Sequence, residues 1–299
     1  MDENEWLAER FEEHRGQLRA VAYRMLGSLS EADDAVQDAW VRIHRAGADD
    51  VENVGGWLTT IVARVCLNVL RSRRQRREES LEDRLPDPII SSEDAPHPED
   101  EALLADSVGL ALQVVLETLT PAERLAFVLH DMFEFPFDEI APMLGRTPAA
   151  ARQLASRGRR RVKGADVPAP DPDLSRQREV VDAFFAAARG RDFDGLVAVL
   201  HPDVVLRADF GGRRPGAPTV FRGAEAVARQ AQLGATPAAE LHPALVNGAA
   251  GVVITMRGRP FAVMAFTVTG GRIAEIDAIA DPDRVRVIAR AVLAGGPSA

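Results

Sequence analysis

The sequence predicts a multidomain fold: two all-α domains, the second containing a helix-turn-helix, are followed by an α+β domain. Three observations support this prediction. Apolar residues recur at helical spacing in residues 18–65 and 108–162. A stretch rich in acidic residues and proline separates these two regions. Beyond residue 174, two helical segments precede short apolar runs with turn signals, which is typical of antiparallel strands.

The first region is expected to form three helices. Apolar residues at 18–26 share one face, and a glycine follows them. Ser30 can cap the next helix, whose buried stripe includes Trp40. After a loop over Gly47–Gly56, a third helix begins near Trp57 and runs into a cluster of arginines.

The distribution of charge is more informative than the net charge of -9. Between Glu78 and Asp106 there are eleven acidic residues and one basic residue, so the rest of the chain is near neutral. Four prolines in this stretch favour an extended linker. Two basic clusters, at 71–77 and 152–163, stand at the ends of expected helices. Such a cluster is either a phosphate-binding surface or an ordinary solvated helix end.

Residues 137–148 predict a helix and a tight turn that lead into a second helix. Small and apolar residues form a narrow seam along the second helix, and polar residues point outward. This arrangement suits a recognition helix, because one face packs closely while the other can bond base edges and phosphates. The outward residues are Arg152, Gln153, Ser156 and Arg160.

The C-terminal region is expected to begin with helices and end with antiparallel strands. Gly270-Gly271 lies between two apolar runs and is a strong signal for a two-residue hairpin turn. The expected helices cover 180–189 and 193–200, and the expected strands include 252–256, 261–268 and 273–279.

Composition excludes several classes of protein. The N-terminal residues lack the basic and apolar pattern of a signal peptide, and no apolar stretch is long enough to span a bilayer. We therefore expect a cytoplasmic protein with no membrane partner. Cys66 is the only cysteine, so neither an internal disulfide nor a cysteine metal cluster is possible. No cofactor and no metal site are expected.

Three motifs, in order, resemble the extracytoplasmic-function sigma factors of the sigma-70 family. The acidic run Glu31–Arg42, followed by Trp57-Leu58 and a basic helix, resembles their domain 2. The helix-turn-helix resembles their domain 4. The resemblance covers roughly the first 165 residues and implies promoter-specific initiation of transcription. The implied partners are promoter DNA and core RNA polymerase, through its clamp and flap regions.

The resemblance also implies roles for particular residues. The residues implied to make polar contacts with the clamp are Asp34, Gln37 and Asp38. Capture of the minus-10 element as a single strand needs backbone cations, for which the candidates are Arg64, Arg71, Arg73 and Arg74. The outward residues of the recognition helix would contact the minus-35 element. The acidic linker would follow the path of RNA through the polymerase.

Residues 178–290 resemble the SnoaL-like cone-shaped α+β fold, on the segments Val180–Phe185, Asp192–Asp194 and His201–Val205. Some members of that superfamily are cyclases or isomerases that use a carboxylate or histidine for proton transfer. The sequence identifies no such acid-base pair, so no catalytic residue is assigned. The side chains considered for it are Asp209, Glu275, Asp277 and His201.

The two resemblances together point to sigma factors that carry a SnoaL-like domain. Short segments around residues 84–88, 209–213 and 281–285 resemble motifs of that group. They imply regulation in cis, in which the C-terminal domain contacts the helical domains or the linker. A small ligand of the cone is possible but not identifiable. The implied regulatory residues are Pro86, Asp209, Gly211, Gly212, Arg213, Asp281 and Asp283.

Two other functions stay open at this stage. One is a ligand-sensing helix-turn-helix regulator that never joins polymerase, and the other is a SnoaL-like cyclase or isomerase with a DNA-binding appendage. The acidic helix and linker favour the sigma factor, because an ordinary repressor needs neither. The expected domains are 1–79 (sigma domain 2), 80–107 (acidic linker), 108–165 (sigma domain 4), 166–174 (second linker) and 175–299 (SnoaL-like domain).

Overall fold

The structure, a computed structural model, describes residues 3–46, 51, 53–76, 85–93, 109–165, 168–211 and 220–293. The chain forms two compact units. The described part of the acidic linker belongs to the C-terminal unit. Unit 1 comprises Met1–Leu81 and Leu112–Asp166, and unit 2 comprises Glu82–Ala111 and Val167–Ala299.

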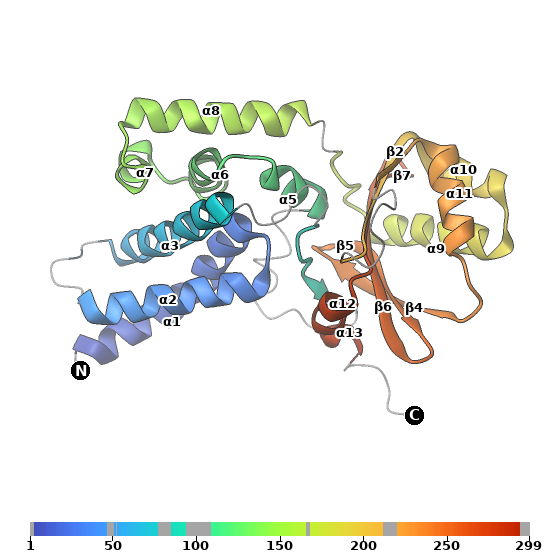
Figure 1. Cartoon of the computed structure of the whole chain (residues 1–299), viewed down its shortest axis with the longest axis horizontal. Coiled ribbons are helices and arrows are strands. Elements are labelled where there is room, and N and C mark those ends of the chain that lie inside the picture. The colour runs from blue at the N-terminus through green and yellow to red at the C-terminus, as the bar shows by residue number, and fades with distance from the viewer. Residues whose placement is uncertain are drawn as a thin grey trace. The chain divides into compact units, whose positions relative to one another are not determined.

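The described residues of unit 1 are helical (Figure 1). Within the unit, the three helices of residues 3–76 form a first helical group. They pack against a second helical group, formed by the helices of residues 110–164. The elements are α1 (Glu3–Leu26), α2 (Leu29–Ala46), α3 (Val54–Arg76), α5 (Leu110–Glu117), α6 (Pro121–Phe127), the π-helix η2 (Val128–Met132), α7 (Phe137–Leu144) and α8 (Pro148–Gly164).

Capping explains where these helices begin. Thr120 and Glu123 form a capping box at α6, so the expected break before Pro121 is confirmed. Helix α3 begins at Val54, earlier than expected, because the Asn53 side chain accepts a hydrogen bond from the Gly56 N–H at 3.0 Å. The last part of the expected loop is therefore the first turn of α3, and residues 47–50 and 52 lie outside the described residues.

Unit 2 contains a seven-stranded sheet in the order β1-β4-β5-β6-β7-β2-β3. Strands β2 and β7 are parallel, and the other neighbours are antiparallel. The strands are β1 (Ile90–Ser91), β2 (Leu200–Asp209), β3 (Val220–Arg222), β4 (Ala239–Val246), β5 (Ala249–Met256), β6 (Arg259–Thr269) and β7 (Arg272–Ile279). The helices are α9 (Leu174–Gly190), α10 (Phe193–Val199), α11 (Ala224–Gly234), α12 (Pro282–Ile288) and α13 (Arg290–Leu293).

The hairpin expected at Gly270-Gly271 is confirmed. Both glycines have positive φ, 59° and 72°, between the antiparallel strands β6 and β7. The Asp171 carboxylate accepts hydrogen bonds from both of their N–H groups, each at 2.9 Å. These bonds hold the pKa of Asp171 below its usual value. The second expected linker is thus bonded to the sheet through Asp171.

The core of unit 2 lies between the sheet and helices α9, α10 and α11, which cover one of its sides (Figure 1). Phe184 of α9 packs edge-on against Phe266 of β6, with 5.7 Å between the ring centroids. Helix α12 also packs against β6. Since side chains alternate along a strand, neighbouring residues of β2 and β7 point to opposite faces of the sheet.

Candidate nucleic-acid interface and linker clasp

The polar residues assigned to polymerase binding lie on the outer face of α2. Asp34, Gln37 and Asp38 are exposed. Asp38 pairs with Arg42 one turn later at 3.0 Å. Asp34 makes no ion pair with any described residue. The three side chains are therefore accessible to a partner.

Trp40 is only half-buried, so the expectation of a core residue is wrong. Its ring lies 4.8 Å from that of Phe11 and 5.8 Å from that of His44, measured between centroids. The indole sits at the edge of the α1–α2 contact, where one side of a large ring stays in water.

The four arginines assigned to the minus-10 element differ in their surroundings. Arg64, Arg71 and Arg74 are exposed and form no ion pair with the described residues. Arg73 is 12% exposed and pairs with Glu31. Three of the four are therefore available to a phosphate backbone, while Arg73 is engaged within unit 1.

The inner face of α8 packs closely on α6. Ala151, Leu154, Ala155 and Gly158 are buried, as the expected seam requires. A Cβ atom at Gly158 would lie 3.0 Å from the Cβ of Phe127, so glycine permits the close approach of the two helices.

Several arginines of α8 are engaged inside the unit. Arg157 and Arg161 pair with Glu123 at 3.2 and 3.3 Å, and Arg159 pairs with Asp131 at 2.6 Å. Burial raises the pKa of Glu123, but hydrogen bonds from Thr120 and these cations outweigh it, so the pKa lies below its ordinary value. These arginines hold α8 in place.

The residues assigned to the minus-35 element lie on the outer face of the same helix. Arg152, Gln153 and Arg160 are exposed, and Ser156 is half-buried. The Arg152 guanidinium lies 5.3 Å from the centroid of the Phe137 ring, which positions it at the start of α8. Neither Arg152 nor Arg160 forms an ion pair with the described residues. Of the arginines on α8, these two are the ones free to bind DNA.

A buried polar contact joins the two helical groups of unit 1. Arg124, which is 2% exposed, donates to the Arg24 carbonyl at 2.8 Å and pairs with Glu117 at 2.8 Å. Gln113 donates to the Tyr23 carbonyl at 3.3 Å. Sequence analysis missed this contact, because an arginine inside an apolar helical run resembles any surface arginine.

The basic ends of the two helical groups also lie close together. Arg74 of α3 and Arg161 of α8 line one cavity of about 440 Å³ in unit 1. The basic end of α3, assigned to the minus-10 element, is therefore adjacent to the C-terminal end of α8.

The linker segment, defined as residues 85–93, is docked on the sheet of unit 2. Strand β1 pairs with β4, with Ile90 opposite Val246. The Ile89 N–H donates to the Asn247 side chain at 2.9 Å, and the Asn247 N–H donates back to the Ile89 carbonyl at 2.8 Å. Pro86 is buried among these contacts. The segment is thus an additional edge strand of the sheet.

Arg284 of α12 fixes the start of the linker segment. It pairs with Asp87 and Asp209 and donates to the Leu85 carbonyl at 2.6 Å. Asp209 also accepts a hydrogen bond from the Leu85 N–H at 3.1 Å. Asp209 is 4% exposed, so Arg284 neutralises a buried carboxylate. We call Asp209, Asn247 and Arg284 the linker clasp.

The other regulatory candidates flank this clasp. Asp281 caps α12, accepting from the Asp283 N–H at 3.0 Å, while Asp283 is exposed. Gly211 has a positive φ of 58°, and a Cβ there would overlap the Asp281 side chain. Gly212 and Arg213 lie outside the described residues.

Sequence analysis did not assign Arg284 or Asn247 to the site. Arg284 stands within the segment 281–285, which was singled out for its aspartates. Asn247 has a φ of 49°, and the Asn247-Gly248 pair is a turn signal between β4 and β5 that could have located it.

The carboxylates considered for catalysis lie away from the interior of the cone. Arg207 pairs with Glu275 at 2.9 Å and with Asp277 at 3.0 Å. Burial raises the pKa of Asp277 to about 6, against the lowering effect of Arg207. Asp209, on the same face of β2 as Arg207, holds the linker. His201 is exposed at the start of β2.

No helix in the described ranges is long and apolar enough to cross a membrane. Among the same residues, no group of three or more His, Cys, Asp or Glu side chains is arranged to hold a metal ion.

Family models match both helical regions. The model of sigma-70 region 2 matches residues 10–77, and that of sigma-70 region 4 matches residues 109–162. Together with the helix-turn-helix, these matches place the helical part in the sigma-70 class of transcription factors.

Full-length relatives extend the match to the C-terminal domain. The chain is 38% identical to the ECF RNA polymerase sigma factor SigJ of Mycobacterium tuberculosis over 289 residues, covering 92% of this chain and 91% of that protein. It is 33% identical to the probable ECF RNA polymerase sigma factor SigI of the same organism, covering 95% and 96%. The crystal structure of M. tuberculosis SigJ aligns with a TM-score of 0.73 and 36% identity, covering 93% of this chain and 97% of that one.

The chain belongs to the extracytoplasmic-function (ECF) RNA polymerase sigma factors, the subunits that direct polymerase to promoters, and its match with these relatives extends over the C-terminal α+β unit. The predicted fold class and function are confirmed at this level. The family is not an enzyme family. The hypothesis of a regulator that never joins polymerase is set aside.

Proposed function

We propose that the exposed acidic face of α2 docks on the polymerase clamp, that α3 captures the minus-10 strand, and that α8 reads the minus-35 element. The pattern of ion pairing supports these assignments. Arg64, Arg71, Arg74, Arg152 and Arg160 are exposed and free of ion pairs with the described residues. By contrast, ion pairs within unit 1 engage Arg73, Arg157, Arg159 and Arg161.

Charge reversal at Asp34 and Asp38 tests the clamp assignment. The double variant Asp34→Lys, Asp38→Lys should bind core polymerase about tenfold or more weakly, because it reverses the charge of two groups that the clamp is proposed to contact. Titration of labelled protein with core polymerase measures the loss. The matched control is Glu9→Lys, Glu13→Lys on α1, which makes the same change of charge at two exposed sites. Equal affinities of both variants would refute the assignment.

Two arginines of α8 test the readout of the minus-35 element. Arg152→Ala should cost ~1–3 kcal/mol at one base pair and relax the preference there, since Arg152 lies at the start of the helix. Arg160→Ala should weaken all sequences alike, as expected for a phosphate contact. Binding to a panel of single-base promoter variants separates the two effects. If both variants weaken binding to every promoter sequence equally, Arg152 does not read a base.

We also propose that the C-terminal domain restrains the sigma domains by holding the linker. The observation that supports this proposal is the docked linker segment. Its backbone hydrogen bonds to the Asp209 and Asn247 side chains are buried in unit 2. The family resemblance implies that the linker occupies the RNA path of polymerase. One segment cannot be a strand of the sheet and lie in that path at the same time. The clasp and polymerase therefore compete for the linker.

Removal of the C-terminal domain tests this competition. A chain that ends at Asp166 lacks the clasp, so it should initiate transcription more strongly than the full chain at matched concentrations. Run-off transcription with purified core polymerase measures the difference. If the truncated and full chains give equal output, the restraining role is wrong.

We further propose that this domain is not a catalyst. Its buried carboxylates Glu275 and Asp277 both pair with Arg207, and Asp209 is bonded to the linker and to Arg284. General acid-base chemistry needs such a group within reach of a bound substrate. None of these three carboxylates lines the cavity inside the cone.

A further inference from the structure

The cavity of unit 1 between α3 and α8 carries an excess of positive charge. It measures about 440 Å³ and also touches the connection between α5 and α6. Among the described residues, Glu117 is the one acidic side chain of its lining. We call it the arginine cavity, after the four arginines of the same lining, which are Arg73, Arg74, Arg124 and Arg161.

The glutamates near the arginine cavity do not balance its charge. Three of the four arginines pair with a glutamate of unit 1, and the pairs are Arg73–Glu31, Arg124–Glu117 at 2.8 Å and Arg161–Glu123 at 3.3 Å. Glu123 also pairs with Arg157 at 3.2 Å, so one carboxylate serves two cations. Arg74 forms no ion pair with any described residue. Arginines therefore outnumber their glutamate partners around this cavity.

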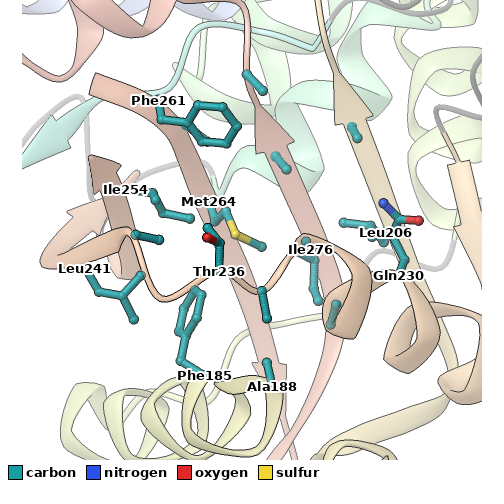
Figure 2. A pocket seen from close by; sticks show the side chains of 18 of the residues that line it. Phe185, Ala188, Leu206, Gln230, Thr236, Leu241, Ile254, Phe261, Met264 and Ile276 are labelled. Carbon is teal, nitrogen blue, oxygen red and sulfur yellow. The ribbon is translucent and has the colours of Figure 1, made fainter. Parts of the chain in front are cut away.

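Other cavities of the chain lack this excess. A second cavity of unit 1, also about 440 Å³, lies on α1 and α2. Its charged side chains pair with each other, Arg15 with Glu12 at 3.0 Å and Arg19 with Asp33 at 2.6 Å. In the cavity inside the cone of unit 2, the side chains labelled in Figure 2 are uncharged, and Arg189 is the one charged residue of the described lining.

The charge and its accessibility favour a phosphate-bearing occupant. Cations gathered in a cavity attract anions strongly, because the surrounding protein focuses their field. Guanidinium groups also match phosphate oxygens geometrically, through two parallel hydrogen bonds. Arg74 and Arg161 are exposed, so an anion can reach both from solvent. Arg161 can turn to an anion without leaving Glu123 unpaired, because Arg157 stays bonded to that carboxylate.

The volume and the position of the cavity narrow the choice of anion. Cavities of roughly 150 Å³ hold one benzene molecule, so this one has room for two or three linked phosphate groups. Arg74 belongs to the first helical group and Arg161 to the second. A chain of phosphates that contacts both arginines therefore links the two groups.

We propose that the arginine cavity binds a small polyphosphate, either inorganic or the phosphate chain of a nucleotide, and that the bound anion holds the two helical groups together. Neither part requires polymerase or promoter DNA. The consequence for transcription rests on the function proposed above, since an anion on Arg74 occupies a candidate contact of the minus-10 element.

The test uses the full chain and inorganic pyrophosphate in calorimetric titrations at constant ionic strength. We expect saturable binding with one site per chain. The double variant Arg74→Gln, Arg161→Gln should bind about tenfold or more weakly, because both guanidinium groups are lost. The matched control Arg42→Gln, Arg159→Gln removes the same charge from α2 and α8 outside the cavity and should bind like the wild type. Absence of saturable binding, or equal losses in the two double variants, overturns the site.

Further titrations distinguish the sources of the phosphate chain. Adenosine triphosphate and inorganic triphosphate are compared without Mg²⁺. Tighter binding of the nucleotide supports a nucleotide as the occupant, whereas equal affinities support the inorganic anion. If Arg74→Gln, Arg161→Gln loses affinity for a short DNA strand while the wild type shows no saturable binding of any polyphosphate, these arginines serve DNA alone and the site is overturned.

Distances between two spin labels test the link between the helical groups. Val41→Cys on α2 and Ala149→Cys on α8 place one label on each group at an exposed position. Cys66 stays unlabelled, because burial raises the pKa of its thiol to about 12. Saturating pyrophosphate should reduce the population of long distances about threefold or more, as a ligand that prefers the closed arrangement does. Saturable binding with an unchanged distance distribution overturns the linking role but not the site.

Discussion

Arg284→Met should release the linker segment and lower the free energy of unfolding of unit 2 by about 3–5 kcal/mol, the range observed when one partner of a buried ion pair is removed. The variant keeps the apolar stem of the side chain but loses the pairs with Asp87 and Asp209 and the bond to the Leu85 carbonyl. Asp209 then stays buried without its cation. Urea unfolding and hydrogen exchange at residues 85–91 measure the two effects.

The same helix provides the control. Arg286→Met removes an arginine that is 66% exposed and pairs only with the exposed Asp283 among the described residues. A surface pair of this kind contributes little to stability, so this variant should behave like the wild type within about 0.5 kcal/mol. If Arg284→Met also leaves the exchange of the linker segment unchanged, Arg284 does not hold the linker.

The consequence for transcription follows from the proposed competition for the linker. A released linker is available to polymerase without first leaving the sheet, so Arg284→Met should raise promoter output relative to Arg286→Met. Gly211→Val should act in the same direction, because its side chain would overlap Asp281, which caps α12. Agreement between the two variants would show that the effect comes from the clasp and not from the loss of a single charge.

Local signals made much of the fold predictable. Helical periodicity indicated the helices of unit 1, and the capping box at Thr120 and the left-handed Gly145 marked two of their boundaries. Gly270-Gly271 located a hairpin because its two positive φ angles require residues of this type. In these cases the information lies within a few residues of the feature.

The docked linker was not predictable in the same way. Its composition indicated an extended chain, which is correct for residues 85–91, but its partners Asp209 and Asn247 lie 124 and 158 positions away from the residues they bind. A strand of two residues has no periodicity to detect. Arg73 was assigned to DNA for its charge, yet Glu31 engages it, and only the packing of α2 on α3 reveals this pair.

The arrangement of unit 1 places a requirement on promoter binding. The minus-10 and minus-35 elements are centred about 25 base pairs apart, which is roughly 85 Å along B-form DNA at ~3.4 Å per base pair. Arg74, assigned to the minus-10 element, and Arg161, at the C-terminal end of the helix assigned to the minus-35 element, line a single cavity in unit 1. On the assignments proposed above, the two helical groups would have to separate before both elements can be bound, and the contact around Arg124 would have to break.

Arg124→Met should favour this separation. It removes the hydrogen bond to the Arg24 carbonyl, which crosses the contact between the two helical groups. It also removes the ion pair with Glu117, which lies beside that contact within the second group. Burial of this arginine suggests a loss of about 3 kcal/mol or more from their association. The radius of gyration of the free protein, measured by small-angle X-ray scattering, should increase. Affinity for a promoter carrying both elements should rise relative to that for a single element, because less of the binding energy is used for opening.

Arg159→Met is the matched control, because this half-exposed arginine pairs with Asp131 within the second helical group and does not bridge the two groups. It should leave both the radius of gyration and the preference for the complete promoter unchanged. The buried contact is also incompletely bonded: Arg24 Nε, Gln113 Oε1 and Arg124 Nη2 have no protein partner among the described residues. Protein hydrogen bonds therefore compensate only part of the free-energy cost of burying these polar groups. The contact should then be weak enough for polymerase to open. An Arg124→Met protein as compact as Arg159→Met, with the same promoter preference, would show that this contact does not control opening.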